Sequence, residues 1–267
     1  MRLNSAAITD HWIAHAQGRL FAREWAGADA DAGPAPPPLV LLHDSLGCVE
    51  LWRDFPALLA RATGRRVIAY DRAGFGRSDA RVERPSLDFV AEEATAWFPL
   101  VARHFGLARF ALLGHSVGGG MAVHIAARHP QNCAALVTIA AQAFVEDRTL
   151  AGLREARASF AEPGALQRLA RYHGDKAAWV LSAWLDTWLD PAFANWSLAD
   201  VLPDVRCRTL ALHGELDEYG SAAHLALIAR GAGGPAHMEL LAGLGHVPQR
   251  DRPEDIVRRV ADFLAGA

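Results

Sequence analysis

Short runs of apolar residues recur along the chain, separated by longer stretches in which apolar residues return every three or four positions. A continuous apolar run is typical of a strand that is buried on both faces, because neither of its sides meets water. Residues 11–25 differ, since they predict two short strands that turn at Gln17-Gly18. Buried strands are predicted over residues 39–43 and 66–70, and further strands over residues 110–113, 134–140, 209–213 and 238–241.

Helical periodicity fills most of the intervals between these strands. Such alternation predicts a mostly parallel sheet with helices on both faces, which is an α/β fold. Residues 26–38, which end in three prolines, predict a loop instead. A helix that follows Ser116 stops before Pro130. The other helices of this kind are predicted over residues 51–62, 88–105, 221–231 and 253–265.

Residues 141–202 interrupt this alternation, because their pattern is helical throughout. We expect this segment to form a helical cap over the carboxyl ends of the strands, inserted into a core of residues 1–140 and 203–267. Its aromatic side chains could line a substrate pocket or pack the cap helices onto the core, because large aromatic surfaces serve either role. The tryptophans considered for the pocket are Trp179, Trp184 and Trp188.

Composition limits the classes of function. The 267 residues are 51% hydrophobic with a net charge of −3, so the chain can bury a large core and offers no basic surface for nucleic acid. Its three cysteines are widely separated, which predicts no metal site and fits a reducing compartment. No stretch resembles a signal peptide or a membrane-spanning helix. We expect a cytoplasmic protein that binds no membrane, and its association into a homo-oligomer is left open.

The stretch Phe110–Val123 carries the strongest chemical signal. An apolar run leads into Gly-x-Ser-x-Gly at residues 114–118, and an alanine-rich helical run follows. This order is typical of a nucleophile elbow, a strand, sharp turn and helix that project a serine hydroxyl from the top of a sheet. Gly114 and Gly118 fit this turn, because a side chain at either position would obstruct the helix as it folds back. Ser116 is therefore the candidate nucleophile.

A serine nucleophile needs a histidine base, and the base needs a carboxylate that orients it. In an elbow fold the three follow one another as serine, acid and histidine. Asp217 and His246 fit that order, and each lies in a loop after a predicted strand, where open α/β sheets place their ligands. Glu215 and Glu218 are rivals for the acid; we prefer Asp217, with Glu215 as a minor rival.

Acyl transfer also needs two backbone N–H donors for the oxyanion of the tetrahedral intermediate. One is expected from Val117, directly after the nucleophile, and the other from Ser45, in the loop that follows the first buried strand. His43, His115 and His213 each precede a turn directly, so we expect them to support the site rather than react.

Five motifs in this order resemble the α/β-hydrolase superfamily across nearly the whole chain, including its esterase, valacyclovir-hydrolase-like and meta-cleavage-hydrolase-like branches. The resemblance implies an α/β-hydrolase fold with an inserted helical cap, a small-molecule ester or related acyl substrate and no cofactor. The motifs are His43–Gly47, Asp71–Ser78, Gly114–Gly118, His213–Asp217 and Gly245-His246.

Some positions depart from particular branches. Asp44 stands where the superfamily usually has glycine; aspartate tolerates a left-handed turn. Its carboxylate would oppose a developing oxyanion, so we expect it to point away. Val117 stands where valacyclovir-hydrolase-like enzymes carry an amine-binding aspartate, and Val247 where meta-cleavage hydrolases often carry tryptophan. A serine at position 116 excludes the dehalogenases and epoxide hydrolases that use an aspartate nucleophile.

The sequence thus predicts a serine hydrolase that cleaves a small to medium carboxylic ester through an acyl-enzyme. One alternative is a C–C bond hydrolase of dienoic diketo acids that uses the same three residues. Another, from a different class, is a non-catalytic receptor for a small molecule. Lactone, thioester and cofactor-free haloperoxidase chemistry also stay open, because their reacting groups are the same.

Overall fold

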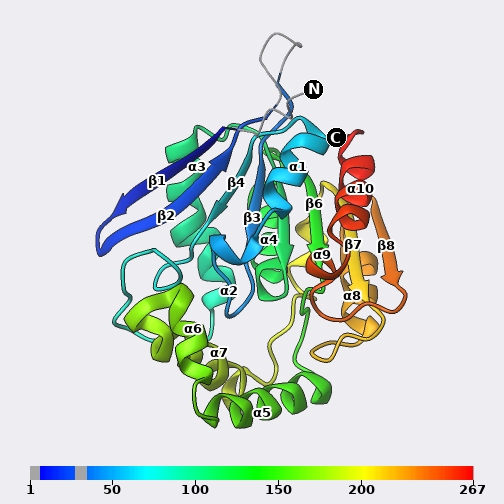
Figure 1. Ribbon diagram of the computed structural model, residues 1–267. Helices are drawn as coiled ribbons and strands as arrows, with labels where there is room; N and C mark the ends of the chain where they lie inside the picture. Colours follow the sequence, from blue (N-terminus) through cyan, green and yellow to red (C-terminus); the bar gives the residue numbers. More distant parts are fainter. Residues whose placement is uncertain (1–6, 28–34, 267) are drawn as a thin grey trace.

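The computed structural model describes residues 7–27 and 35–266 (Figure 1). Residues 1–6, which belong to the stretch examined for a signal peptide, and most of the loop predicted over 26–38 lie outside these ranges. Among the described residues, no helix is long and apolar enough to cross a membrane.

An eight-stranded sheet forms the centre of the molecule, with the strand order β1-β2-β4-β3-β5-β6-β7-β8. The pairs β1–β2 and β2–β4 are antiparallel and the other pairs are parallel, so the predicted mostly parallel sheet is confirmed. The strands are β1 (Ile8–His15), β2 (Gly18–Trp25), β3 (Leu39–Leu42), β4 (Val67–Tyr70), β5 (Phe110–His115), β6 (Cys133–Ile139), β7 (Arg208–Gly214) and β8 (Ala236–Leu241).

Helices cover both faces of this sheet (Figure 1). Strand β3 shows why its sequence has no polar position: Leu39 and Leu41 belong to one hydrophobic cluster together with residues of α1 and α10, whereas Val40 and Leu42 belong to another together with residues of α3, α4 and α8. Successive side chains of a strand point to opposite faces, so a strand covered on both sides is apolar throughout. These helices are α1 (Phe55–Thr63), α3 (Phe98–Phe105), α4 (Val117–Arg128), α8 (Ala222–Gly231) and α10 (Pro253–Leu264).

Two predicted helices are divided in the structure. The helix expected over 51–62 becomes a 3₁₀ turn at Val49–Trp52 followed by α1, because Arg53 between them adopts a positive φ of 52°. The helix expected over 88–105 becomes α2 (Phe89–Glu92), a π-helical turn (Glu93–Trp97) and α3. Proline at position 99 has no N–H to donate to the preceding turn, which explains the widened turn there.

The segment between β6 and β7 holds α5 (Asp147–Ala161), α6 (Ala165–His173) and α7 (Ala177–Trp188). Figure 1 shows these helices gathered beyond the end of the sheet toward which the arrows of β6 and β8 point. The two ends of the segment meet at a bridge between Phe144 and Ser197. The division into a core and a cap of residues 141–202 stays a proposal.

Candidate active site

Ser116 occupies the turn between β5 and α4 in a strained backbone conformation, with φ 56° and ψ −129°. Two close backbone approaches make the turn. A Cβ at Gly114 would collide with the carbonyl oxygen of Gly118, and a Cβ at Gly118 would collide with that of Leu42. The glycines of the motif are therefore required by the crossing of strand and helix, which is the geometry of a nucleophile elbow.

His246 lies between Ser116 and Asp217. Its Nε2 atom is 3.0 Å from the Ser116 Oγ atom, and its Nδ1 atom is 2.9 Å from both carboxylate oxygens of Asp217. The three residues come from the loops after β5, β7 and β8, which meet at the carboxyl edge of the sheet. All three side chains are buried, so solvent weakens these contacts little.

The Asp217 carboxylate has further donors besides His246. Its Oδ1 atom accepts from the backbone N–H groups of Tyr219 (2.8 Å) and Gly220 (3.1 Å). Burial raises the pKa of Asp217, but the hydrogen bond and charge of His246, the charge of His213 and the Tyr219 N–H outweigh it and hold that pKa below its ordinary value. A carboxylate that stays ionised can keep the histidine Nδ1 protonated and its Nε2 free to accept a proton.

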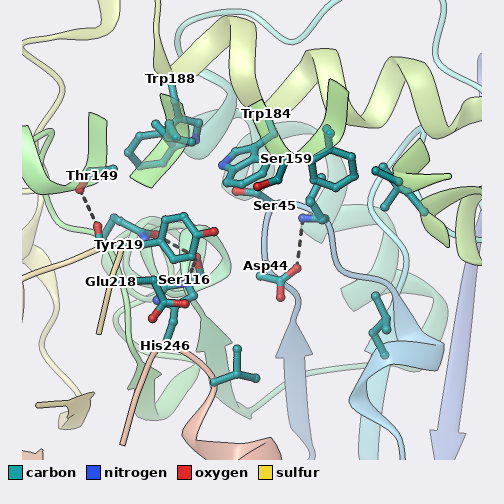
Figure 2. A pocket seen from close by; sticks show the side chains of 18 of the residues that line it. Asp44, Ser45, Ser116, Thr149, Ser159, Trp184, Trp188, Glu218, Tyr219 and His246 are labelled. Carbon is teal, nitrogen blue, oxygen red and sulfur yellow. Dashed lines mark hydrogen bonds between the residues drawn. The ribbon is translucent and has the colours of Figure 1, made fainter. Parts of the chain in front are cut away.

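The start of α5 holds the loop that carries this acid. The Arg148 guanidinium donates to the Asp217 carbonyl oxygen at 3.1 Å, and the Thr149 hydroxyl donates to the Tyr219 carbonyl oxygen at 2.6 Å (Figure 2). The Tyr219 ring in turn lies against the His246 ring, with centroids 4.9 Å apart. The segment between β6 and β7 is thereby connected to the base through backbone and ring contacts.

The two rival acids lie elsewhere. Glu215 is exposed and accepts from the backbone N–H of Gly243 at 3.0 Å. Glu218 is also exposed and lines the cavity. Asp217, rather than either glutamate, contacts His246.

The loop after β3 is held by a neutral histidine. The backbone N–H of Arg72 donates to the Nε2 atom of His43, so His43 carries its proton on Nδ1 and donates it to the Asp44 carbonyl oxygen at 2.8 Å. Burial and the Arg72 charge hold the pKa of His43 well below its ordinary value. Because the C=O and N–H of a trans peptide point in opposite directions, this contact turns the Ser45 N–H away from His43.

The Asp44 side chain occupies the position where the resemblance described above leads us to expect glycine. Its Oδ1 atom accepts from the Leu46 N–H at 3.1 Å, and its Oδ2 atom is 3.3 Å from Nδ1 of His115. Burial raises its pKa, but the hydrogen bond and charge of His115 outweigh burial and lower the pKa of Asp44 well below the ordinary value. Both oxygens thus have partners other than the N–H groups of Ser45 and Val117.

A cavity of about 470 Å³ opens beside Ser116 and His246. Its walls include Trp184 and Trp188 from α7, which Figure 2 shows on the side opposite His246. Ser45 also lines it, whereas Val117 is fully buried at the first position of α4.

The expectation for Trp179 is corrected, because this residue does not line the cavity. Its ring packs edge-on against Phe75 at 5.6 Å and lies over Gly74. Both contacts belong to the Gly-rich loop after β4, so Trp179 packs α7 onto that loop.

The Gly-rich loop, residues 71–78, holds neighbouring backbone segments together through hydrogen bonds. The two oxygens of Asp71 accept from the backbone N–H groups of Val49 and Arg77, each at 2.6 Å. The Ser78 hydroxyl donates to the Asp71 carbonyl oxygen and accepts from the Phe21 N–H. The motif therefore fixes backbone beside the site and supplies no reacting group to it.

Sequence reasoning missed Gln142. Its Oε1 atom is 3.0 Å from Ser116 Oγ, its side chain is buried, and it lines the same cavity. Gln142 stands three residues after the end of β6, as Asp217 stands three residues after the end of β7. A polar residue shortly after a strand is the available signal, but the helical pattern assigns position 142 to the cap.

Among the residues that the structure describes, no group of three His, Cys, Asp or Glu side chains is placed to hold a metal ion.

The sequence and the structure both have known relatives. A family model described as alpha/beta hydrolase fold matches residues 37–206. A 135-residue alignment is 35% identical to the dihydrolipoyllysine-residue acetyltransferase component of the acetoin cleaving system of Pseudomonas putida, covering 43% of this chain and 35% of the relative. Proline iminopeptidase of Lactobacillus helveticus is 33% identical over 102 residues, covering 38% and 34%. The matches thus span about a third of the length of these curated relatives.

Solved structures are similar over nearly the whole chain. A bacterial membrane phospholipase A has a TM-score of 0.77 and 21% identity, covering 97% of this chain and 86% of its own. Proline iminopeptidase from Mycobacterium smegmatis has a TM-score of 0.71 and 22% identity, covering 97% and 98%. Naproxen esterase from Bacillus subtilis has a TM-score of 0.73 and 17% identity, covering 97% and 92%. At these identities the likeness establishes the fold and leaves the reaction open.

Proposed function

Because the chain belongs to the α/β-hydrolase fold family, we propose that it is a serine hydrolase that cleaves small to medium carboxylic esters through an acyl-enzyme. The observation that carries the proposal is the position of His246, 3.0 Å from the Ser116 hydroxyl and 2.9 Å from the Asp217 carboxylate. A hydroxyl in contact with a base, and a base in contact with a buried carboxylate, are the requirements for nucleophilic catalysis by serine.

In the proposed reaction, Ser116 Oγ attacks the acyl carbon while His246 Nε2 takes its proton. His246 then gives that proton to the departing alcohol, which leaves an acyl ester on Ser116. Water completes the cycle by the same proton transfers and releases a carboxylic acid. Asp217 holds the required tautomer of His246 and stabilises its charged form.

The oxyanion is proposed to bind the backbone N–H groups of Val117 and Ser45. The first belongs to the free N-terminal turn of α4, where unpaired N–H groups favour negative charge. The orientation of the second is supported by the contact between His43 and the Asp44 carbonyl oxygen, which faces the opposite way.

The proposed substrate class follows from the cavity. A volume of about 470 Å³ suits a small to medium molecule, and its apolar walls include Leu153, Trp184 and Trp188. Three of the helices in residues 141–202 contribute to these walls, which supports their proposed role as a cap over the site.

The test is steady-state hydrolysis of p-nitrophenyl esters from acetyl to decanoyl, with Ser116→Ala as the control. We expect multiple turnovers in the wild type, no turnover in the variant, and a chain-length optimum that reflects the size of the cavity. If no ester is turned over, the proposal is wrong; a dienoic diketo acid would then be assayed as a C–C bond substrate.

A further inference from the structure

Gln142 contacts the proposed nucleophile without belonging to the proposed triad. Its Oε1 atom and the Nε2 atom of His246 are each 3.0 Å from Ser116 Oγ. A serine hydroxyl has only one proton, so it can satisfy one of these two acceptors at a time. The arrangement therefore supplies one acceptor more than the free enzyme can use.

Acylation removes the hydroxyl proton that these two acceptors share. Once Ser116 Oγ is part of an ester it has no proton, so Gln142 Oε1 loses its donor within the site. Gln142 is only 5% exposed, and a buried acceptor without a donor is costly. The acyl-enzyme thus contains an unsatisfied oxygen beside the acyl group that must next be attacked.

The water that cleaves the acyl-enzyme has two O–H groups, and each of them needs a hydrogen-bond acceptor. It gives one proton to His246 Nε2, and its second O–H needs an acceptor. Gln142 Oε1 lies 3.0 Å from Ser116 Oγ in a cavity that is also lined by Asp44 and Glu218. An acceptor close to the acyl ester would both satisfy that O–H and fix the orientation of the water.

We propose that Gln142 Oε1 accepts the second O–H of the hydrolytic water and thereby directs the acyl-enzyme toward hydrolysis rather than transfer to an alcohol. This inference rests on the proposed function. In the step, the water oxygen bonds to the acyl carbon and one water proton passes to His246. The bond from the carbon to Ser116 Oγ then breaks, His246 returns the proton to Oγ, and a carboxylic acid leaves.

Methanol provides a matched comparison with water. It has one O–H for His246, and a methyl group replaces the second, so it has no proton to give Gln142. Removing the acceptor should therefore slow attack by water and leave attack by methanol nearly unchanged. A general disturbance of Ser116 or His246 would slow both reactions alike.

The experiment supplies wild type, Gln142→Met and Gln142→Glu with p-nitrophenyl butyrate in aqueous methanol, and measures the ratio of butyric acid to methyl butyrate. Methionine keeps the approximate volume and has no comparable acceptor, whereas glutamate keeps an oxygen acceptor. We expect Gln142→Met to lower the acid-to-ester ratio about tenfold, the effect of one lost hydrogen bond, and Gln142→Glu to keep it within about threefold.

Either of two results would overturn the inference: an unchanged ratio in Gln142→Met, or an equal change in both variants. Failure of the proposed function itself has a different signature, because the wild type would then form neither product in a manner that depends on Ser116.

Discussion

The Asp44 carboxylate lies 3.3 Å from Nδ1 of His115, whose Nε2 donates to the backbone carbonyl oxygen of His246 at 2.8 Å. The buried ring of His115 therefore joins the loop after β3 to the loop that carries the proposed base. Aspartate at position 44 takes part in the packing of the site, which gives a physical role to the departure from the usual glycine.

Replacing Asp44 tests that role. Asp44→Asn should lower the free energy of unfolding by about 1 kcal/mol at neutral pH, since the contact of a partly buried carboxylate with His115 is lost. The pKa of Asp44 is below its ordinary value of 3.8 in the folded state, so its contribution is present above that value and is lost as the pH falls toward the folded one. Urea unfolding should give a smaller difference between variant and wild type at about pH 3; a difference that does not depend on pH would contradict this account.

The acid of the proposed triad is tested by a pair of variants. Asp217→Asn should lower the turnover number about 10⁴-fold, because the amide favours the wrong tautomer of His246. Glu215→Gln should stay within about twofold of wild type, since Glu215 is exposed and contacts Gly243 instead. Steady-state kinetics on one ester decides between them, and a larger loss in the Glu215 variant would transfer the role to that residue.

The hydrogen bond from Thr149 of α5 to the loop that carries Asp217 should affect both stability and turnover. Thr149→Val removes the donor to the Tyr219 carbonyl oxygen and leaves that oxygen unpaired, which should cost about 1–2 kcal/mol of stability. Turnover should fall several-fold as Tyr219 shifts on the His246 ring. Thr149→Ser keeps the hydroxyl and should restore both unfolding free energy and turnover; a serine variant as impaired as the valine variant would assign the effect to lost packing.

Alanine substitutions on the two faces of α7 should have different effects on substrate preference and on stability. Trp184→Ala should move the ester optimum to longer acyl chains, because Trp184 lines the cavity. Trp179→Ala should lower stability without moving the optimum, since Trp179 packs on Phe75 and Gly74. Rates on the p-nitrophenyl ester series give the optimum of each variant, and urea unfolding gives its stability. A shifted optimum in the Trp179 variant would argue that α7 moves as a unit.

Much of the fold was predictable because its signals are local. The apolar run at 39–43 predicts a doubly covered strand, and the glycines at 114 and 118 predict a tight crossing, and both are confirmed. The divided helices were missed because a single positive φ at Arg53 and the proline at 99 act on backbone geometry without altering the apolar period.

The site was less predictable where it depends on contacts between distant residues. Asp44 and His115, or Gln142 and Ser116, are separated in the chain and meet only after the sheet forms. Trp179 and Trp184 are the same residue type, yet Trp179 lies on a different face of the helix and packs against the loop after β4. Composition cannot distinguish such faces when a helix is apolar over most of its surface.

A buried carboxylate, Glu93, lies away from the site and makes the stability of the fold depend on pH. Glu93 is 2% exposed, and its Oε1 atom accepts from the Tyr70 hydroxyl at 2.6 Å. Burial raises the pKa of Glu93 from 4.5 to about 7, although the Tyr70 hydrogen bond and the Arg72 charge oppose this shift. The folded protein therefore binds the Glu93 proton more tightly than the unfolded chain, and ionisation of this group destabilises the fold.

The fold loses stability as Glu93 ionises. The stability supplied by protonated Glu93 is complete below about pH 4.5 and is lost as the pH rises to about 7, a loss of roughly 3 kcal/mol for such a shift. Glu93→Gln keeps an acceptor for Tyr70 and cannot ionise, so its stability relative to wild type should increase over this interval and then level off. Urea unfolding at about pH 4, 6 and 8 measures the trend, with the exposed Glu83→Gln as a control for the loss of one negative charge. A relative stability that stays constant over the interval would mean that Glu93 is ionised in the fold at little cost, and that Arg72 compensates its burial.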